Sequence, residues 1–134
     1  MEISDLILAD YAATNDRGKF TLVGAGITEI TILKLPWIHP LIFLMVRLKI
    51  TRMDIGKNRV EIKIVGEKGM IFKAEGDVDV SPDHQDEQHC PLPFQLVNLK
   101  FDQAGDYSIE VRINGDLKQS QNLRIKRIEP AVAS

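Results

Sequence analysis

A chain of 134 residues with 44% hydrophobic and 27% charged side chains has the size and composition of a folded domain, which excludes an intrinsically disordered protein. Its 17 basic and 19 acidic residues give a formal net charge of -2, so the basic excess that draws proteins onto phosphate backbones is absent. We therefore expect a packed core and no nucleic-acid partner.

The N-terminal residues and the apolar runs argue against export and against membrane insertion. Residues 1–5 lack the positive charge and long apolar run of a secretory signal. The longest apolar stretch, residues 41–46, is far shorter than the roughly 20 residues of a membrane-spanning helix. Cys90 is the only cysteine, so no disulfide forms within the chain. We expect a soluble, cytoplasmic protein.

Apolar residues recur at every second position along most of the chain, which predicts strands and an all-β fold. Residues 6–13 and 19–24 flank the turn sequence Asn15-Asp16-Arg17-Gly18 and are therefore expected to form a first hairpin. A shorter strand is expected over residues 27–32. Asp10 lies inside the first of these apolar runs, where we expect its carboxylate to bond to backbone or to lie at a sheet edge.

The same opening carries the most distinctive sequence of the chain. Leu8-Ala9-Asp10-Tyr11-Ala12 is followed by Gly18-Lys19-Phe20-Thr21-Leu22-Val23-Gly24-Ala25-Gly26. These two stretches resemble the start of a family of short, uncharacterised bacterial proteins, a domain of unknown function. The resemblance implies no activity, cofactor or partner.

A long central strand is predicted from residue 41 to residue 51, because the even positions from Ile42 to Ile50 are all apolar and place one face in the core. Leu41, Phe43 and Met45 make the first half of the opposite face apolar too. Something must cover that half. It is either an internal segment (residues 36–40, residues 81–93 or the C-terminal tail) or another chain.

If another chain covers this face, a protein partner or a second copy of the chain is expected to bind at Trp37, Leu41, Phe43 and Met45. Trp37 lies just upstream between Pro36 and Pro40, and the prolines stiffen the segment that carries the indole. Large buried aromatic side chains are typical anchors of protein interfaces.

Two further hairpins follow. Alternating residues 59–64 and 72–80 flank Gly66-Glu67-Lys68-Gly69, and alternating residues 107–113 and 117–125 flank Asn114-Gly115-Asp116. In the last hairpin a two-residue loop would turn Leu117, Leu123 and Ile125 away from the core. We therefore predict a three-residue loop or a bulge.

Gly105-Asp106-Tyr107 resembles a corner of immunoglobulin-like domains, in which a tyrosine hydroxyl bonds to upstream backbone. Gly105 and Tyr107 are accordingly expected to be structural. Roughly eight or nine strands at this spacing predict an antiparallel two-sheet β-sandwich, immunoglobulin-like or a related Greek key. We expect one domain over residues 1–128 and a short tail over residues 129–134.

The acidic segment over residues 77–90 is the strongest candidate for a ligand site. Its potential metal ligands are Asp83, His84, Asp86, Glu87 and His89. They come from one stretch without the spaced, paired ligands of zinc sites or the glycine of calcium loops, so a solvated loop ended by Pro91 and Pro93 is favoured.

No nucleophile elbow, positioned base or phosphate-binding loop is recognisable, which argues against an enzyme and against a cofactor. The sequence favours a non-enzymatic protein-interaction module. The alternative is a ligand- or metal-binding module that uses residues 77–90.

Overall fold

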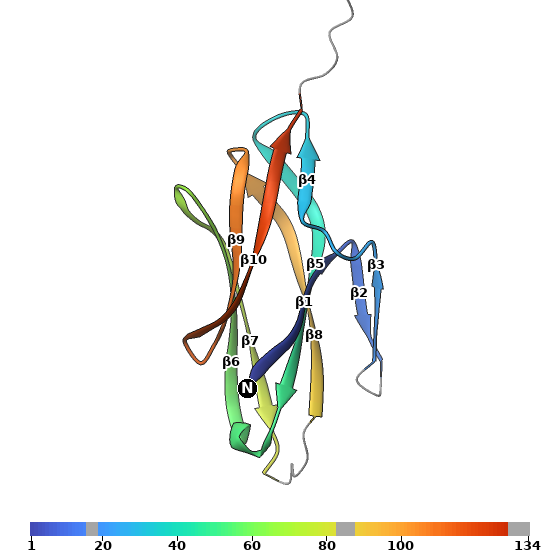
Figure 1. Ribbon diagram of the computed structural model, residues 1–134, viewed down its shortest axis with the longest axis vertical. Coiled ribbons are helices and arrows are strands. Elements are labelled where there is room, and N and C mark those ends of the chain that lie inside the picture. Colours follow the sequence, from blue (N-terminus) through green and yellow to red (C-terminus); the bar gives the residue numbers. More distant parts are fainter. Residues whose placement is uncertain (16–18, 83–87, 129–134) are drawn as a thin grey trace, which may run out of the picture.

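The computed structural model describes residues 1–15, 19–82 and 88–128. These residues form ten strands and a short 3-10 helix, Arg52–Asp54, which confirms the all-β class (Figure 1). The strands are β1 (Glu2–Ala9), β2 (Tyr11–Thr14), β3 (Phe20–Val23), β4 (Glu29–Ile32), β5 (Trp37–Ile50), β6 (Gly56–Gly66), β7 (Gly69–Val80), β8 (Gln88–Phe101), β9 (Gly105–Ile113) and β10 (Asp116–Arg127).

The strands make three sheets rather than the two expected. One has the order β1-β5-β8, with β5 central as predicted, and another has the order β4-β10-β9-β6-β7. The third consists of β2 and β3 alone. The pairs are antiparallel except that β4 runs parallel to β10, which the antiparallel prediction missed.

The extra sheet arises because the first predicted strand breaks at Asp10. Ala9 still pairs with Phe43 of β5, but the Asp10 amide donates to the Val23 carbonyl at 3.0 Å. Gly24 has a φ of 61°, and the Asp10 carboxylate occupies the space where a Cβ on Gly24 would lie. The chain therefore leaves the sheet at Asp10 and turns into the β2–β3 hairpin.

The two larger sheets share the main core. Alternate residues of each strand point into it, and the largest of the fully buried side chains are Phe101, Leu8, Ile42, Leu44, Leu48, Ile62, Ile64, Leu96, Leu99, Ile109 and Ile113. The alternation read from the sequence of β6 and β9 is the alternation of burial in the structure, whereas residues 42–46 of β5 are buried on both faces.

The last hairpin confirms the predicted bulge. Asn114 and Gly115 form a two-residue loop with φ values of 52° and 86°, so that Ile113 pairs with Asp116. The register then shifts between Leu117 and Gln119, which returns the following apolar residues of β10 to the core. Leu117, which precedes the shift, stays exposed.

Strand β8 corrects part of the reading of residues 81–93 as a loop, because residues 88–93 are strand. Pro91 and Pro93 lie inside this strand, opposite Arg47 and Met45 of β5. β8 is an edge strand, where a missing amide hydrogen on the open side removes no ladder hydrogen bond. Two prolines two residues apart are therefore compatible with pairing on the other side.

The hydroxyl of Tyr107 donates to the Gln103 carbonyl at 2.7 Å, as the tyrosine-corner prediction required. Its ring packs edge-on against Phe101, with the ring centroids 5.1 Å apart. Tyr107→Phe keeps this ring contact and leaves the carbonyl without its donor, so we expect a loss of about 0.5–1.5 kcal/mol in the free energy of unfolding. Chemical denaturation measures it, and an unchanged midpoint would show that the hydrogen bond adds nothing.

The turn from β5 to β6 depends on the buried carboxylate of Asp54. It accepts hydrogen bonds from the Met1 amine at 2.8 Å and from the Thr51 amide at 2.8 Å, and Thr51 in turn caps the 3-10 helix. Burial favours the neutral acid, but these hydrogen bonds outweigh it and hold the pKa of Asp54 below its ordinary value of 3.8.

Asp54→Asn is therefore expected to destabilise the protein by about 1–3 kcal/mol at neutral pH, because the amide turns a donor toward groups that also donate. A lowered folded-state pKa contributes stability above the ordinary value of 3.8 and loses it as pH falls through the lower one. The difference between wild type and variant in urea denaturation should thus shrink in acid. The exposed Asp102→Asn is the control, and a constant difference down to acid pH would contradict the assignment.

Candidate functional site

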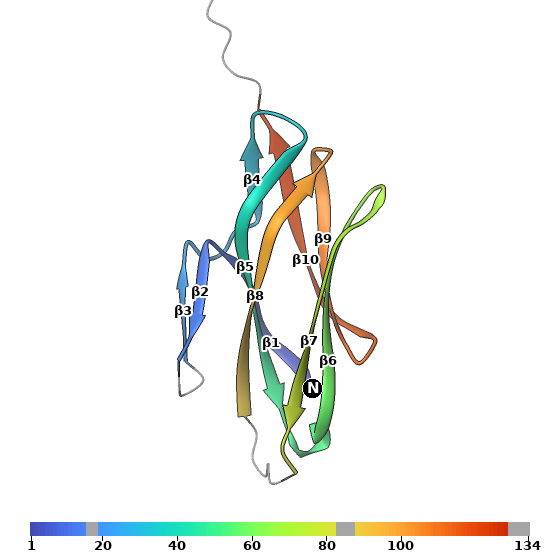
Figure 2. The same ribbon diagram turned by 180° about the vertical axis from the view of Figure 1, so that it is seen from behind.

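The outer face of β5 is covered by the chain's own β2–β3 hairpin, which lies against the outside of the β1-β5-β8 sheet (Figures 1 and 2). Phe43 is 4% exposed and Met45 is 0% exposed. The cover consists of the apolar side chains of the hairpin, with one from β1. These are Ala12, Phe20, Leu22 and Ile7. The cover is thus internal and comes from a segment that was not among the three expected, of which residues 83–87 and 129–134 lie outside the described residues.

Two contacts at the rim fix the hairpin on the sheet. The Tyr11 ring meets the Phe43 ring edge-on, with centroids 5.4 Å apart. The Arg47 guanidinium lies 5.9 Å from the centroid of Phe20 and pairs with the Asp5 carboxylate at 3.0 Å. Aromatic and cation–π contacts therefore add to the apolar burial.

Trp37 lies against the main core rather than over the outer face, and its side chain is half-buried. The reason is a change of face within the paired strands. Asn98 of β8 has a φ of 53°, and Leu96 before it and Leu99 after it are both buried. Trp37 pairs with the buried Phe101 beyond this point. It therefore faces the other side from Leu41, although both are odd-numbered.

The neutral form of the neighbouring His39 is favoured. Burial lowers the pKa of His39, and the negative charge of Asp10 offsets part of that effect. The Trp37 indole N–H donates to Nδ1 of His39 at 3.3 Å, which uses that nitrogen as an acceptor.

Leu41 remains on the surface, and three other apolar side chains are exposed around it. Leu41 is 43% exposed and pairs with Val97, which is 51% exposed. Along the same face, Leu41 is two residues from Phe43, whose ring touches Tyr11. Tyr11 in turn pairs with Val23 across the hairpin, and both are about half exposed. We call these four side chains the hairpin-side patch: Tyr11, Val23, Leu41 and Val97.

The acidic segment is divided between a strand end and residues outside the described ones. Asp83, His84, Asp86 and Glu87 lie outside the described residues. His89 belongs to β8, and its Nδ1 lies 3.5 Å from the Ser4 hydroxyl. Within residues 1–15, 19–82 and 88–128, no group of three or more His, Cys, Asp or Glu side chains is placed to hold a metal ion.

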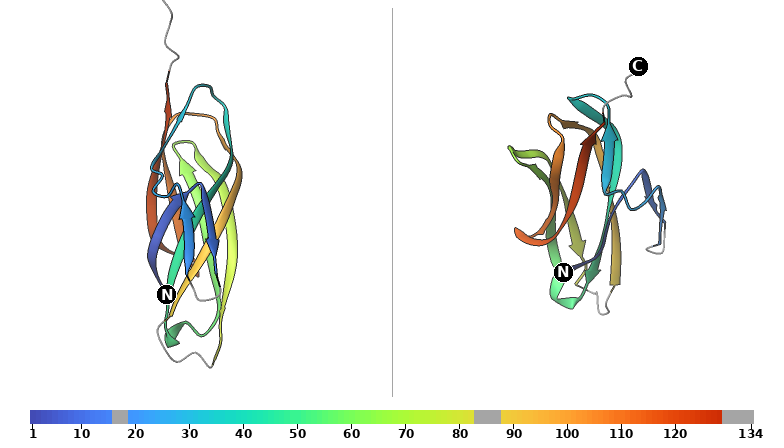
Figure 3. Two further views of the ribbon diagram at one scale, coloured as in Figure 1. Left: turned by 90° about the vertical axis from the view of Figure 1, so that its right-hand side faces the viewer. Right: turned by 45° about the horizontal axis from the view of Figure 1, so that its top comes forward.

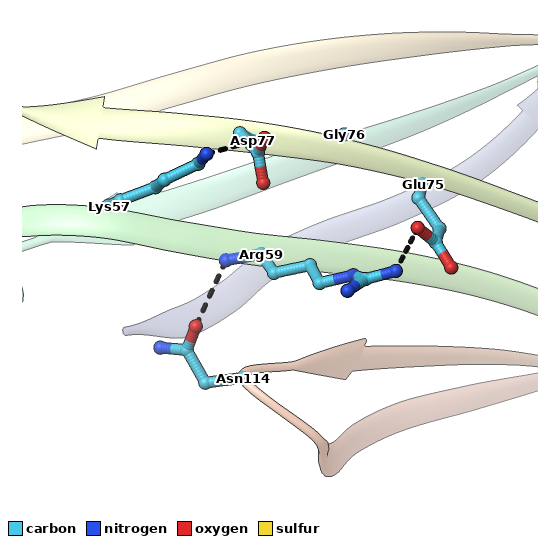
Figure 4. A pocket seen from close by; sticks show the side chains of 6 residues that line it. All are labelled: Lys57, Arg59, Glu75, Gly76, Asp77 and Asn114. Carbon is cyan, nitrogen blue, oxygen red and sulfur yellow. Dashed lines mark hydrogen bonds and ion pairs between the residues drawn. The ribbon is translucent and has the colours of Figure 1, made fainter.

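An open depression of about 540 Å³ lies over β6 and β7, and Asp77 from the acidic segment lines it (Figure 4). Its charged side chains already pair with one another. Lys57 lies 3.5 Å from Asp77, and Arg59 pairs with Glu75. The Arg59 amide also donates to the Asn114 side chain at 2.9 Å. These pairings neutralise the charges that would hold an ionic ligand.

Sequence reasoning missed the hairpin-side patch because it did not place the hairpin on the sheet. One signal was present: Ala12 and the alternating Phe20 and Leu22 gave the hairpin an apolar face that needed a partner surface.

The described part of the chain contains no helix long and apolar enough to cross a membrane.

A scan of the sequence against models of protein families matches residues 4–126 to the Family of unknown function (DUF6941). A search among curated proteins gives no match. The match confirms the expected membership of a family without an assigned activity.

Proposed function

The chain belongs to this family of unknown function, and we propose that it is a non-enzymatic, cytoplasmic protein-interaction module of the immunoglobulin-like sandwich type. It binds another protein through the hairpin-side patch. Two large facing sheets that share one core, together with the Tyr107 hydroxyl bond to Gln103, support the proposed fold type.

The observation that carries this function is the exposure of four apolar side chains on the covered sheet and its hairpin. Tyr11, Val23, Leu41 and Val97 come from four different strands: Leu41 pairs with Val97, Tyr11 pairs with Val23, and the Tyr11 ring packs on Phe43, two residues from Leu41. Single exposed apolar residues are ordinary on protein surfaces, whereas contiguous ones that include an aromatic ring favour an interface.

The patch is supported by buried and paired residues. Tyr11 rests on the buried Phe43 ring, and Leu41 pairs with Val97 between β5 and β8. A preformed surface loses little conformational entropy on binding, which increases the affinity obtained from a small contact area. Phe43 and Met45 contribute to this surface by supporting it from beneath.

The chemistry of the nearby groups supports the non-enzymatic part of the proposal. Burial lowers the pKa of His39, and its Nδ1 accepts a hydrogen bond from the Trp37 indole, so this nitrogen is not free to act as a base. Burial raises the pKa of the Cys90 thiol, which disfavours the thiolate that a nucleophile needs.

A site-specific photo-crosslinker tests the proposal. Placed at Val97 in the cells that make the protein, it should give one discrete adduct, which mass spectrometry identifies. The same crosslinker at Leu117, which is equally exposed on the other large sheet, is the control. The partner identified in this adduct is then purified without the crosslink. In calorimetry it should bind the wild-type chain at least about tenfold more tightly than it binds the Leu41→Arg variant. No discrete adduct at Val97, or equal affinities, would refute the proposal.

A further inference from the structure

The five-stranded sheet ends in a long edge strand, β7. Within the described part of the chain, β7 pairs with β6 alone. Figure 3, left, shows β7 running along one border of the molecule. An edge strand presents a row of backbone amide and carbonyl groups that can pair with another chain.

The other sheet edges carry features that discourage such pairing. β8 has Pro91 and Pro93, which lack amide hydrogens, and β4 is only four residues long. The register of β1 against β5 is irregular between Ile3 and Asp5. β7 contains no proline, and its register shift is confined to the end near Met70. Its remaining length, residues 72–80, is regular.

Side chains of this regular part alternate between two faces. Phe72, Ala74 and Gly76 face inward, and Lys73 and Glu75 face solvent on either side of Ala74. The Lys73 ammonium lies 2.9 Å from the Glu75 carboxylate, and Glu75 also pairs with Arg59 of β6. The charges on the outer face therefore alternate in sign around Ala74.

We propose that β7 pairs antiparallel with β7 of a second copy of this chain, about a twofold axis at Ala74. A twofold axis there places Ala74 opposite Ala74 of the partner subunit, and Lys73 opposite Glu75 of the partner subunit. By symmetry the charge pair forms twice. On the inner face the large Phe72 lies opposite the small Gly76 of the partner subunit.

Neighbouring registers are worse electrostatically. An axis at Lys73 places this lysine opposite Lys73 of the partner subunit, and an axis at Glu75 places this glutamate opposite Glu75 of the partner subunit. An axis at Gly76 places Glu75 opposite Asp77 of the partner subunit, again twice. Like charges directly opposite each other destabilise a strand pair, and opposite charges stabilise it. The register centred on Ala74 is the one among these four that has no like-charged pair.

The first test is the solution mass across a concentration series, by sedimentation velocity on the full chain of 15.1 kDa. Wild type should pass from one chain to two as concentration rises. Lys73→Glu and Glu75→Lys should each weaken association by about tenfold or more, and the double variant should restore it. Lys126→Glu, in β10 between two paired strands, should change nothing. A monomer at every concentration, or no rescue by the double variant, would overturn the proposal.

The second test fixes the register by disulfide crosslinking in a Cys90→Ser background. Antiparallel partners lie within the Cα separation that a disulfide spans, so Ala74→Cys should form a linked dimer under mild oxidation. Asp79→Cys, on the same strand but far from the axis, is the matched control. Equal rates of crosslinking for the two would overturn the register. Leu41→Arg should leave the linked dimer intact, which separates this surface from the hairpin-side patch.

Discussion

Phe43→Ala is expected to lower the free energy of unfolding by about 3–5 kcal/mol, the usual cost of removing a buried phenylalanine from a packed core. Phe43 is 4% exposed between β5 and the β2–β3 hairpin. Its loss leaves a cavity beneath the hairpin and removes the ring against which Tyr11 packs. Urea denaturation followed by circular dichroism measures the change.

Leu41→Ala is the matched control, because Leu41 lies two residues away on the same face of the same strand but is 43% exposed. It should change stability by less than about 1 kcal/mol. The two variants therefore separate the covered part of this face from the exposed part. Equal stability of Phe43→Ala and wild type would mean that the hairpin does not cover the sheet in solution.

Gly66→Ala, at the end of β6, is expected to lower the free energy of unfolding by about 1–3 kcal/mol. A Cβ at Gly66 would lie 2.6 Å from a carbon of the Tyr107 ring. That ring cannot move away freely, because it packs on Phe101 and its hydroxyl is bound to the Gln103 carbonyl. Thermal unfolding should show the lowered midpoint.

Gly76→Ala in β7 provides the comparison. Both glycines lie in strands and neither has a positive φ. A Cβ at Gly76 would lie 3.6 Å from the Phe94 ring, which is an ordinary contact distance. Removing a flexible glycine from a strand should leave stability unchanged or raise it by up to about 1 kcal/mol. Equal losses at the two positions would show that the close approach of Tyr107 is not the cause.

Local patterns predicted much of this fold. Alternation identified β6, β7 and β9 because each has one face in the core and one in solvent, and it identified β5 from its inner face. The direction of Leu123 and Ile125 required either a three-residue loop or a bulge, since a one-residue change of register turns every later side chain to the other face, and the structure has the bulge. The Tyr107 hydroxyl bond was readable because it spans only four residues.

Features that depend on contacts between distant parts of the chain could not be predicted from the sequence. The break at Asp10 is set by its hydrogen bond to Val23 and by the space above Gly24, and neither is local. Pro91 and Pro93 indicated a loop, because only the sheet order shows that β8 is an edge strand. The positive φ of Asn98 reversed the face of Trp37 through the partner strand.

The candidate site also had a part that local sequence predicted and a part that depended on distant contacts. Sequence alone identified the apolar outer face of Leu41, Phe43 and Met45 and the need for a cover. It could not identify the cover, because an apolar face matches many surfaces and its contacts with β2 and β3 are made by side chains far apart in the chain. The hairpin-side patch exists only once the cover is in place.

The attachment of the β2–β3 hairpin also determines how the molecule opens. Among the described residues, its two strands pair with each other and with no strand of the larger sheets, so separating the hairpin from β5 breaks no ladder of those sheets. Such a partial opening costs less free energy than global unfolding. We therefore expect amide hydrogen exchange to be faster in the hairpin than in β5.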